Sequence, residues 1–229
     1  MLWTVTGLCA VMLLAVAIVV PETRPAPDRR HGTGSSYLAS VRRVLRSSGY
    51  WGHTAVFALS FAMMMAYISA SPFVYQRVLG LSEVEYGIAF GVNAAGLIGA
   101  GAVVSRIVER VDPHRIVSVA LTLQITSTAA LVLLVVLGAP VWTYAVAIFF
   151  AVLSNGGIMG TSAALAMAHV REVAGTGSAL LGFSQFALGA VVSPLVGLSG
   201  EESALAPGLV MAASSLLAAA ASRVARRTG

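Results

Sequence analysis

Polar, aromatic and methionine side chains recur along one side of a long apolar stretch. At spacings of four, three, four and four residues, they are Ser60, Met64, Tyr67, Ser71 and Tyr75. These spacings place the five side chains on one face of an α-helix. Methionine and aromatic groups adapt to ligands of many shapes. The stripe therefore predicts a binding surface for bulky amphiphilic molecules, with packing against another helix as the alternative.

Other apolar stretches carry isolated polar groups of the same kind. Phe90 and Asn93 share a helical face in the next stretch, and Gln124 and Gln185 lie near the middle of two later ones. A buried amide in lipid is costly unless it is paired, so we expect these side chains to face other helices or a cavity. The candidates for lining a substrate cavity are Met64, Tyr67, Ser71, Tyr75, Phe90, Asn93, Gln124 and Gln185.

Catalytic and metal-binding patterns are not visible in the sequence. The four histidines have no metal-ligand spacing and read as ordinary interfacial residues: His31, His53, His114 and His169. The absence of lysine excludes a retinal Schiff base. We therefore expect neither an enzyme, nor a metal site, nor a cofactor.

Composition indicates the medium in which the chain folds. Of its 229 residues, 58% are apolar and 10% charged, and the mean hydropathy is +0.87. Soluble domains carry about 25% charged residues. The arginines lie at the ends of apolar stretches and form no basic stripe interleaved with aromatics, which argues against a nucleic-acid partner. The chain is expected to bind a lipid bilayer.

Apolar stretches long enough to cross a membrane predict an all-α membrane protein with about seven transmembrane helices. The stretches are residues 1–20, 52–78, 83–104, 116–137, 141–168, 175–198 and 205–221. The segment Ala15-Val16-Ala17 leaves a cleaved signal peptide as the alternative for the first stretch, although no basic residue precedes it.

Orientation follows from the arginines, because short positively charged connections stay in the cytoplasm. Every arginine except Arg77 falls on one side of the expected membrane. The chain should therefore begin outside the cell and end in the cytoplasm. Arg106, Arg110 and Arg115 lie in one such connection, where they are candidates for a cytoplasmic latch between helix ends. The alternative for these three is a topology signal alone.

Three segments organise the chain: residues 1–20, one helix; residues 21–50, an arginine-rich cytoplasmic linker; and residues 51–229, six helices with a short tail. Within the linker, Leu38, Val41, Val44 and Leu45 have helical spacing. We expect a short helix there, either on the inner membrane surface or solvated as part of the linker.

Several motifs carry a resemblance to a known family. YISASPFVYQ at Tyr67–Gln76, followed by Gly80-Leu81-Ser82, resembles the seventh and eighth helices of bicyclomycin-resistance-type (Bcr/CflA) exporters of the major facilitator superfamily. The segment Ala174–Leu198 and the triplet Pro21-Glu22-Thr23 resemble the same group.

Two positions depart from the family pattern. Asp112 stands where glycine is more usual, and Gly160-Thr161-Ser162 stands where a Pro-Asn pair is expected. With Asn155-Gly156-Gly157, the second departure predicts bends or packing notches in residues 141–168.

The resemblance implies the C-terminal six-helix half of a twelve-helix transporter, plus one preceding helix that corresponds to the family's sixth. Family members are secondary transporters built from three-helix inverted repeats around a central cavity. The implied function is drug efflux by proton antiport across the cell (inner) membrane, with a small amphiphilic drug as substrate. No acidic residue lies in the interior of an apolar stretch, since Glu83 and Glu85 are at the start of theirs, so the coupling carboxylate is expected in a missing N-terminal half. The alternative is an inert truncated half, or a membrane module that assembles with another polypeptide.

Overall fold

The computed structural model describes residues 2–19, 34–197 and 204–228, and these residues form helices without any strand. The elements are α1 (Leu2–Val19), α2 (Gly34–Arg46), α3 (Ser48–Phe73), the π-helical segment η2 (Val74–Val78), α4 (Glu83–Ile107), α5 (Pro113–Val136), α6 (Trp142–Ala168), the 3₁₀ turn η3 (Arg171–Val173), α7 (Ala174–Gly197) and α8 (Leu205–Thr228). The expected all-α fold class is confirmed. The expected linker stretch 21–33, with His31 and Pro21-Glu22-Thr23, lies outside the described residues.

Six helices in the described part of the chain are long and apolar enough to cross a membrane. They are Ser48–Val78, Glu83–Ile107, Pro113–Val136, Trp142–Ala168, Arg171–Gly197 and Leu205–Arg226. Helix α1 contains a shorter apolar stretch, Thr6–Val16, at the place of the first expected crossing. The fold is therefore that of a multi-pass membrane protein.

Local sequence signals explain how α4 and α5 begin. Gly80 has a φ of +72°, a left-handed conformation that glycine adopts without strain, and it ends the α3–η2 segment. Ser82 then caps α4 through a reciprocal pair of hydrogen bonds with Glu85. Asp112 caps α5 by accepting a hydrogen bond from the His114 backbone N–H at 2.9 Å. The departure from glycine at position 112 thus has a structural role as a helix cap.

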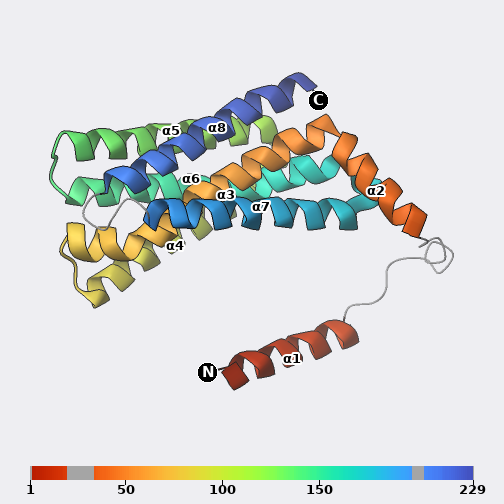
Figure 1. Ribbon diagram of the computed structural model, residues 1–229, viewed down its shortest axis with the longest axis horizontal. Helices are drawn as coiled ribbons and strands as arrows, with labels where there is room; N and C mark the ends of the chain where they lie inside the picture. The colour runs from red at the N-terminus through yellow and green to blue at the C-terminus, as the bar shows by residue number, and fades with distance from the viewer. Residues whose placement is uncertain (1, 20–33, 198–203, 229) are drawn as a thin grey trace. The chain divides into compact units, whose positions relative to one another are not determined.

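Residues 1–39 and 40–229 form two separate compact units. In the second unit, α3 and α6 lie between α5 and α8 on one side and α4 and α7 on the other (Figure 1). Helix α3 packs against α6, α7 and α8, while α6 packs against α3, α4 and α5. The six helices form two triplets, α3–α5 and α6–α8. When α3 is matched with α6, α4 with α7 and α5 with α8, the same main contacts occur in both triplets. The unit therefore consists of two interlocked three-helix groups with the same main contacts, which agrees with what transporters built from inverted repeats require.

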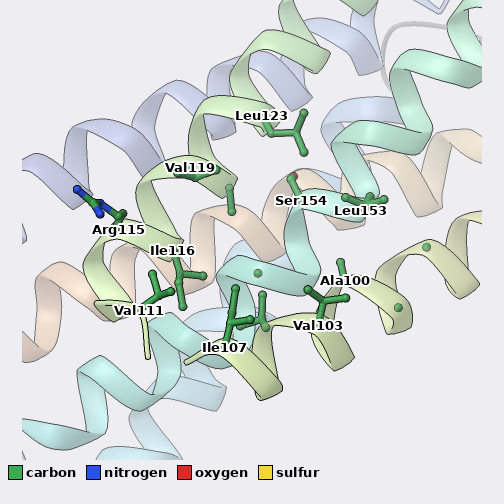
Figure 2. Close-up of a pocket in the computed structure, with 15 residues that line it drawn as sticks. Ala100, Val103, Ile107, Val111, Arg115, Ile116, Val119, Leu123, Leu153 and Ser154 are labelled. Carbon is green, nitrogen blue, oxygen red and sulfur yellow. The ribbon is translucent and has the colours of Figure 1, made fainter. Parts of the chain in front are cut away.

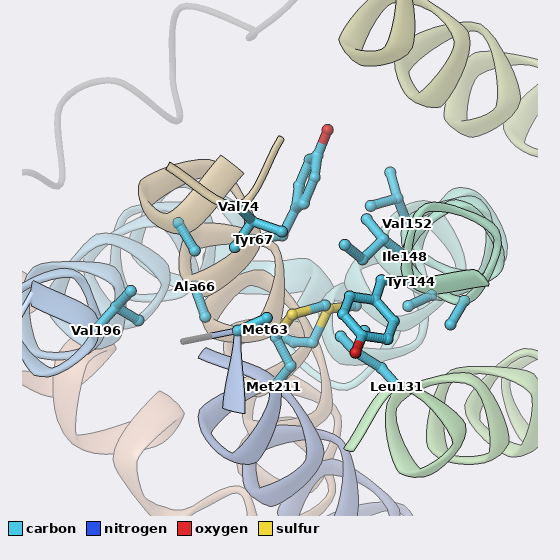
Figure 3. Close-up of a cluster of buried hydrophobic side chains, with 14 of the residues drawn as sticks. Met63, Ala66, Tyr67, Val74, Leu131, Tyr144, Ile148, Val152, Val196 and Met211 are labelled. Atoms are coloured by element: carbon cyan, nitrogen blue, oxygen red, sulfur yellow. The ribbon is translucent and has the colours of Figure 1, made fainter. Parts of the chain in front are cut away.

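The largest buried cluster joins the two triplets near the ends of α3 and α8 (Figure 3). Met63 and Met211 are almost completely buried and lie side by side with Tyr144 and Leu131. Tyr67 belongs to the same cluster, but its hydroxyl is directed away from the methionines (Figure 3). The apolar core thus holds the ring of Tyr67 in place and leaves its polar end free for other contacts.

Glycine lets two helices from different triplets approach closely. A Cβ atom at Gly156 of α6 would lie 2.5 Å from the Leu97 carbonyl oxygen and 2.8 Å from the Gly101 nitrogen, both on α4. Since these are backbone atoms, they cannot move aside as a flexible side chain could. The expected packing notch at Gly156 is confirmed, whereas a Cβ at Gly160 would meet nothing within 4 Å. Helix α6 runs without a break through both positions.

The last residues of α2 are fixed to the second unit. Val44 is completely buried in a cluster with Tyr50, Ala166 and Val170, and Arg43 forms an ion pair with Glu172. The expected helix in the linker is confirmed, and one side of its C-terminal part packs on the ends of α3 and α6.

Candidate functional site

A buried asparagine links two tyrosines across α3 and α4. The Asn93 Nδ2 atom donates one hydrogen bond to the Tyr67 hydroxyl at 2.9 Å and another to the Tyr75 hydroxyl at 3.0 Å. All three side chains are at least 96% buried, with exposed fractions of 3%, 4% and 1% for Asn93, Tyr67 and Tyr75. The two N–H groups of the amide are therefore both used, in a region where water is largely excluded.

A change of helix type positions Tyr75. Pro72 lies inside α3 and has no N–H to donate to the helix. After it the backbone widens into the π-helical segment η2, where the Leu79 N–H donates to the Val74 carbonyl at 2.9 Å. π-Helical turns occur frequently at functional sites. Sequence reasoning did not predict this segment, and the signal that could have indicated it was Pro72 within YISASPFVYQ.

Further aromatic residues complete the site. Tyr86 shares a hydrogen bond with Ser71 at 3.0 Å between their hydroxyl oxygens, and Phe90 stacks on Tyr67 with ring centroids 6.0 Å apart. Tyr86 also contacts the rings of Tyr75 and Phe90, at 6.0 and 6.1 Å. We call this group the tyrosine–asparagine cluster; its members are Tyr67, Ser71, Tyr75, Tyr86, Phe90 and Asn93. Five of them are predicted candidates, and Tyr86 was missed as a site residue.

The remaining cavity candidates lie elsewhere. Gln124 of α5 donates through Nε2 to the Asn155 Oδ1 atom of α6 at 3.4 Å. Among the described residues, Gln124 Oε1 and Asn155 Nδ2 have no hydrogen-bond partner. Gln185 of α7 and Met64 of α3 are half-buried, and no described hydrogen bond joins Gln185 to the tyrosine–asparagine cluster. The predicted grouping of all eight residues in one cavity stays a prediction.

The space beside the cluster is small. A cavity of about 10 Å³ lies next to Tyr67 and Ser71, on the side of α5, α6 and α8. Ligand sites for drug-sized molecules have volumes of about 300–1,000 Å³. The cluster is therefore closed in this conformation. A much larger groove of about 650 Å³ lies between α4, α5 and α6 (Figure 2), where sequence reasoning predicted no site.

The predicted latch arginines are exposed around the α4–α5 connection. Arg106, Arg110 and Arg115 form no side-chain hydrogen bond or ion pair with a described residue. Arg226 of α8 instead donates to the His114 carbonyl and the Ser118 hydroxyl of α5. The latch hypothesis stays a prediction, and Arg226 is a helix-to-helix contact that the sequence did not reveal.

The three histidines in the described residues lie together. His53 is buried, with its ring centroid 5.3 Å from that of His114 and 5.7 Å from that of His169. His114 is at the start of α5 and His169 directly follows α6, so the three rings lie at helix ends, and their interfacial role stays a prediction. In the described residues, no group of three or more His, Cys, Asp or Glu side chains is arranged to hold a metal ion.

Two curated proteins are similar in sequence to this chain. The chain is 28% identical over 200 residues to the uncharacterised MFS-type transporter YdgK of Bacillus subtilis (strain 168), covering 87% of this chain and 50% of that protein. It is also 28% identical over 187 residues to a bicyclomycin resistance protein homolog of Haemophilus influenzae (strain ATCC 51907 / DSM 11121 / KW20 / Rd), covering 80% of this chain and 47% of that protein. The chain thus spans about half the length of these curated relatives. No solved structure matches it.

Residues 1–194 match the family model described as Major Facilitator Superfamily. This match covers most of the chain and includes the tyrosine–asparagine cluster, the first triplet and most of the second. The six apolar helices and the repeated triplets are what membrane transporters of this kind require. The chain belongs to the Major Facilitator Superfamily.

Proposed function

We propose that the chain forms the C-terminal, substrate-facing half of a secondary exporter for small amphiphilic drugs. The observation that carries this proposal is the buried hydrogen-bonded cluster of Asn93, Tyr67 and Tyr75 within an otherwise apolar helix pair. Polar groups inside membrane helices are rare and commonly serve ligand or ion pathways. The name of the Haemophilus relative, a bicyclomycin resistance protein homolog, supports a drug as the substrate.

The cluster has the chemistry that such a substrate requires. Its four aromatic rings offer flat apolar surfaces, while four hydroxyls and one amide offer exchangeable hydrogen bonds. A ligand with polar groups can replace the Asn93 bonds to the tyrosines, so opening the cluster leaves no buried polar atom without a partner. We propose that the described conformation is the closed one and that substrate entry separates α3 from α4.

The exposure of the helices supports a second half opposite this one. Helices α3 and α6 are mostly buried, whereas α4 and α7 are mostly exposed along their length. Alternating access in inverted-repeat transporters uses two helical bundles that rock around a site between them. Because the chain spans about half the length of its relatives, we propose that α4 and α7 contact an N-terminal half.

We propose that the group that carries the coupled proton lies in the N-terminal half. The acidic residues of α4 are at its first turn, Glu83 and Glu85, and Glu109 follows its end. None of these lies at the depth of Asn93, which is eight residues after Glu85 on α4, so we propose that the proton carrier comes from elsewhere. With the arginine-rich connections in the cytoplasm, the N-terminus is outside the cell and the C-terminus inside.

The half-length match also favours a second candidate function: a membrane module without transport of its own that assembles with another polypeptide. Expression of residues 1–229 in a drug-sensitive, exporter-deleted bacterium separates the two. We expect membrane-located protein and unchanged accumulation of bicyclomycin or ethidium. Co-expression with the N-terminal half of the Bacillus relative, with assembly checked by affinity co-purification, should lower accumulation.

Variants make this test specific to the cluster. In the assembled pair, Asn93→Ala should abolish most of the efflux, while Ser105→Ala, at an exposed hydroxyl bonded only to the Ala102 carbonyl, should leave it unchanged. Strong efflux by residues 1–229 alone would refute the half-transporter proposal. An assembled pair with equal efflux for both variants would show that the cluster is structural.

A further inference from the structure

An apolar groove of about 650 Å³ runs between α4, α5 and α6 (Figure 2). Val103 and Ile107 of α4 lie on one side of it, Val119 and Leu123 of α5 lie on the other, and α6 contributes Leu153 between them (Figure 2). Gly99 of α4 adds no side chain to fill the space, and a Cβ there would meet nothing within 4 Å, whereas a Cβ at Gly96 would meet the Phe149 ring of α6. The groove is therefore a built-in gap on the bundle surface, separate from the tyrosine–asparagine cluster.

The length of the groove along α4 is close to the thickness of one membrane leaflet. On α4 its lining extends from Gly96 to Ile107, which at 1.5 Å per residue is about 16 Å. The hydrocarbon core of a bilayer is about 30 Å thick, so the groove covers about half of it. One end lies near the middle of the membrane, and the other lies at the connection that contains Val111. This is the depth that the acyl chain of a single lipid occupies.

A positive charge lies at the end of the groove next to the α4–α5 connection. Arg115 lines that end, and Figure 2 shows its guanidinium directed away from the apolar walls. Arg115 is exposed and forms no side-chain hydrogen bond or ion pair with a described residue. Arg106 and Arg110, in the same connection, are also without such partners. Two acidic residues, Glu109 and Asp112, are close to Arg115 in the sequence, and Asp112 caps α5. The site thus joins an apolar slot to an unpaired guanidinium.

We propose that this groove binds an anionic phospholipid of the arginine-side leaflet, with an acyl chain in the slot and the phosphate at Arg115. The charge complementarity selects an anionic headgroup, because basic residues at the cytoplasmic end of membrane helices attract such lipids. This lipid site goes beyond the proposed function and does not depend on drug transport.

Photo-crosslinking tests the site directly. Residues 1–229 are reconstituted in phosphatidylcholine nanodiscs with a trace of phosphatidylglycerol that carries a diazirine in its acyl chain, and labelled peptides are located by mass spectrometry. We expect labels on α4 and α5 at the groove. A phosphatidylcholine probe with the same acyl diazirine should label these peptides about fivefold less, the effect of roughly one favourable charge at the surface.

Two substitutions and their matched controls identify the two parts of the site. Arg115→Gln should remove the preference for phosphatidylglycerol, while Arg115→Lys should retain it and Arg171→Gln, at an exposed arginine outside the groove, should not change it. Gly99→Leu should reduce labelling by both probes, because a Cβ at Gly99 meets nothing within 4 Å and the side chain can enter the groove. Gly91→Leu, on the same helix and equally unobstructed, should have no effect.

The outcomes decide the proposal. Equal labelling by both probes, or a preference unchanged by Arg115→Gln, would show only general lipid contact and overturn it. Loss of groove labelling when an N-terminal half is bound would show that a protein segment occupies the groove instead. Circular dichroism and size-exclusion profiles of each variant are compared with those of the parent chain. Identical profiles establish that every variant is folded.

Discussion

The amide nitrogen of Asn93 lies 2.9 Å from the hydroxyl oxygen of Tyr67, although the two residues are on different helices and 26 positions apart. The same nitrogen reaches Tyr75, so one side chain of α4 holds two points of the α3–η2 segment. Any separation of α4 from α3 must break both bonds together. A substitution of Asn93 should therefore change both the free energy of unfolding and the ease with which the cluster opens.

Asn93→Ala should lower the free energy of unfolding by about 1–3 kcal/mol, because two buried tyrosine hydroxyls lose their donor. The measurement is thermal or denaturant unfolding of the purified chain in a mild detergent, followed by circular dichroism. Ser105→Ala is the control, with an expected change below about 0.5 kcal/mol.

The triple variant Asn93→Leu, Tyr67→Phe, Tyr75→Phe should be more stable than Asn93→Ala, since it leaves no unpaired polar group in the cluster. If the triple variant is less stable than Asn93→Ala, the hydrogen bonds are not the main contribution of Asn93. Drug binding by the assembled transporter should nevertheless be lost in both variants.

Gly156→Ala should destabilise the bundle by about 1–3 kcal/mol, since the added methyl group would collide with backbone atoms of α4. Gly160→Ala, four residues later in the same helix, should be neutral or stabilise the helix by up to about 1 kcal/mol. Unfolding midpoints of the two variants in detergent provide the comparison. Equal destabilisation by both would mean that helix flexibility, rather than close approach, explains the glycines.

The proposed orientation predicts which connections react with an impermeant thiol reagent. In a Cys9→Ser background, Val141→Cys between α5 and α6 should be labelled from outside intact cells, and Glu109→Cys after α4 should be labelled only after lysis. The arginine asymmetry is the physical reason. The reverse labelling pattern would contradict the proposed topology.

Replacing Arg106, Arg110 and Arg115 together by lysine separates a latch from a topology signal. Lysine keeps the positive charge but lacks the planar, bidentate geometry of arginine. A latch predicts that the assembled transporter loses most of its efflux while the thiol-labelling pattern stays the same. Normal efflux would leave the three residues with a topological role, and phosphatidylglycerol crosslinking should persist in either case.

The helices could be predicted closely because lipid requires long apolar segments, and glycine and serine mark the turns between them. Gly80 and Ser82, for example, end one expected helix and begin the next. The face shared by Tyr67, Ser71 and Tyr75 was also visible in the spacing. What the spacing could not provide was the partner on the neighbouring helix, such as Tyr86 for Ser71 or Asn155 for Gln124.

Two further features could not be predicted from helical periodicity. The π-helical segment η2 places Tyr75 toward Asn93, and its hydrogen-bond pattern has no simple period in the sequence. The groove exists because α4 and α5 stand apart over α6, while Gly99 leaves the space between them unfilled. Neither the separation of two helices nor the space that it creates is encoded by one helix considered by itself.

The interlocking of the two triplets bears on how the protein is made. Most neighbours of α3 are in the second triplet, since α3 packs chiefly on α6, α7 and α8. During synthesis α3, α4 and α5 enter the membrane before α6, α7 and α8, so each has its own backbone hydrogen bonds satisfied before the helices that bury α3 exist. The buried contacts of α3 can therefore form only after the second triplet has been inserted, and the two triplets assemble late.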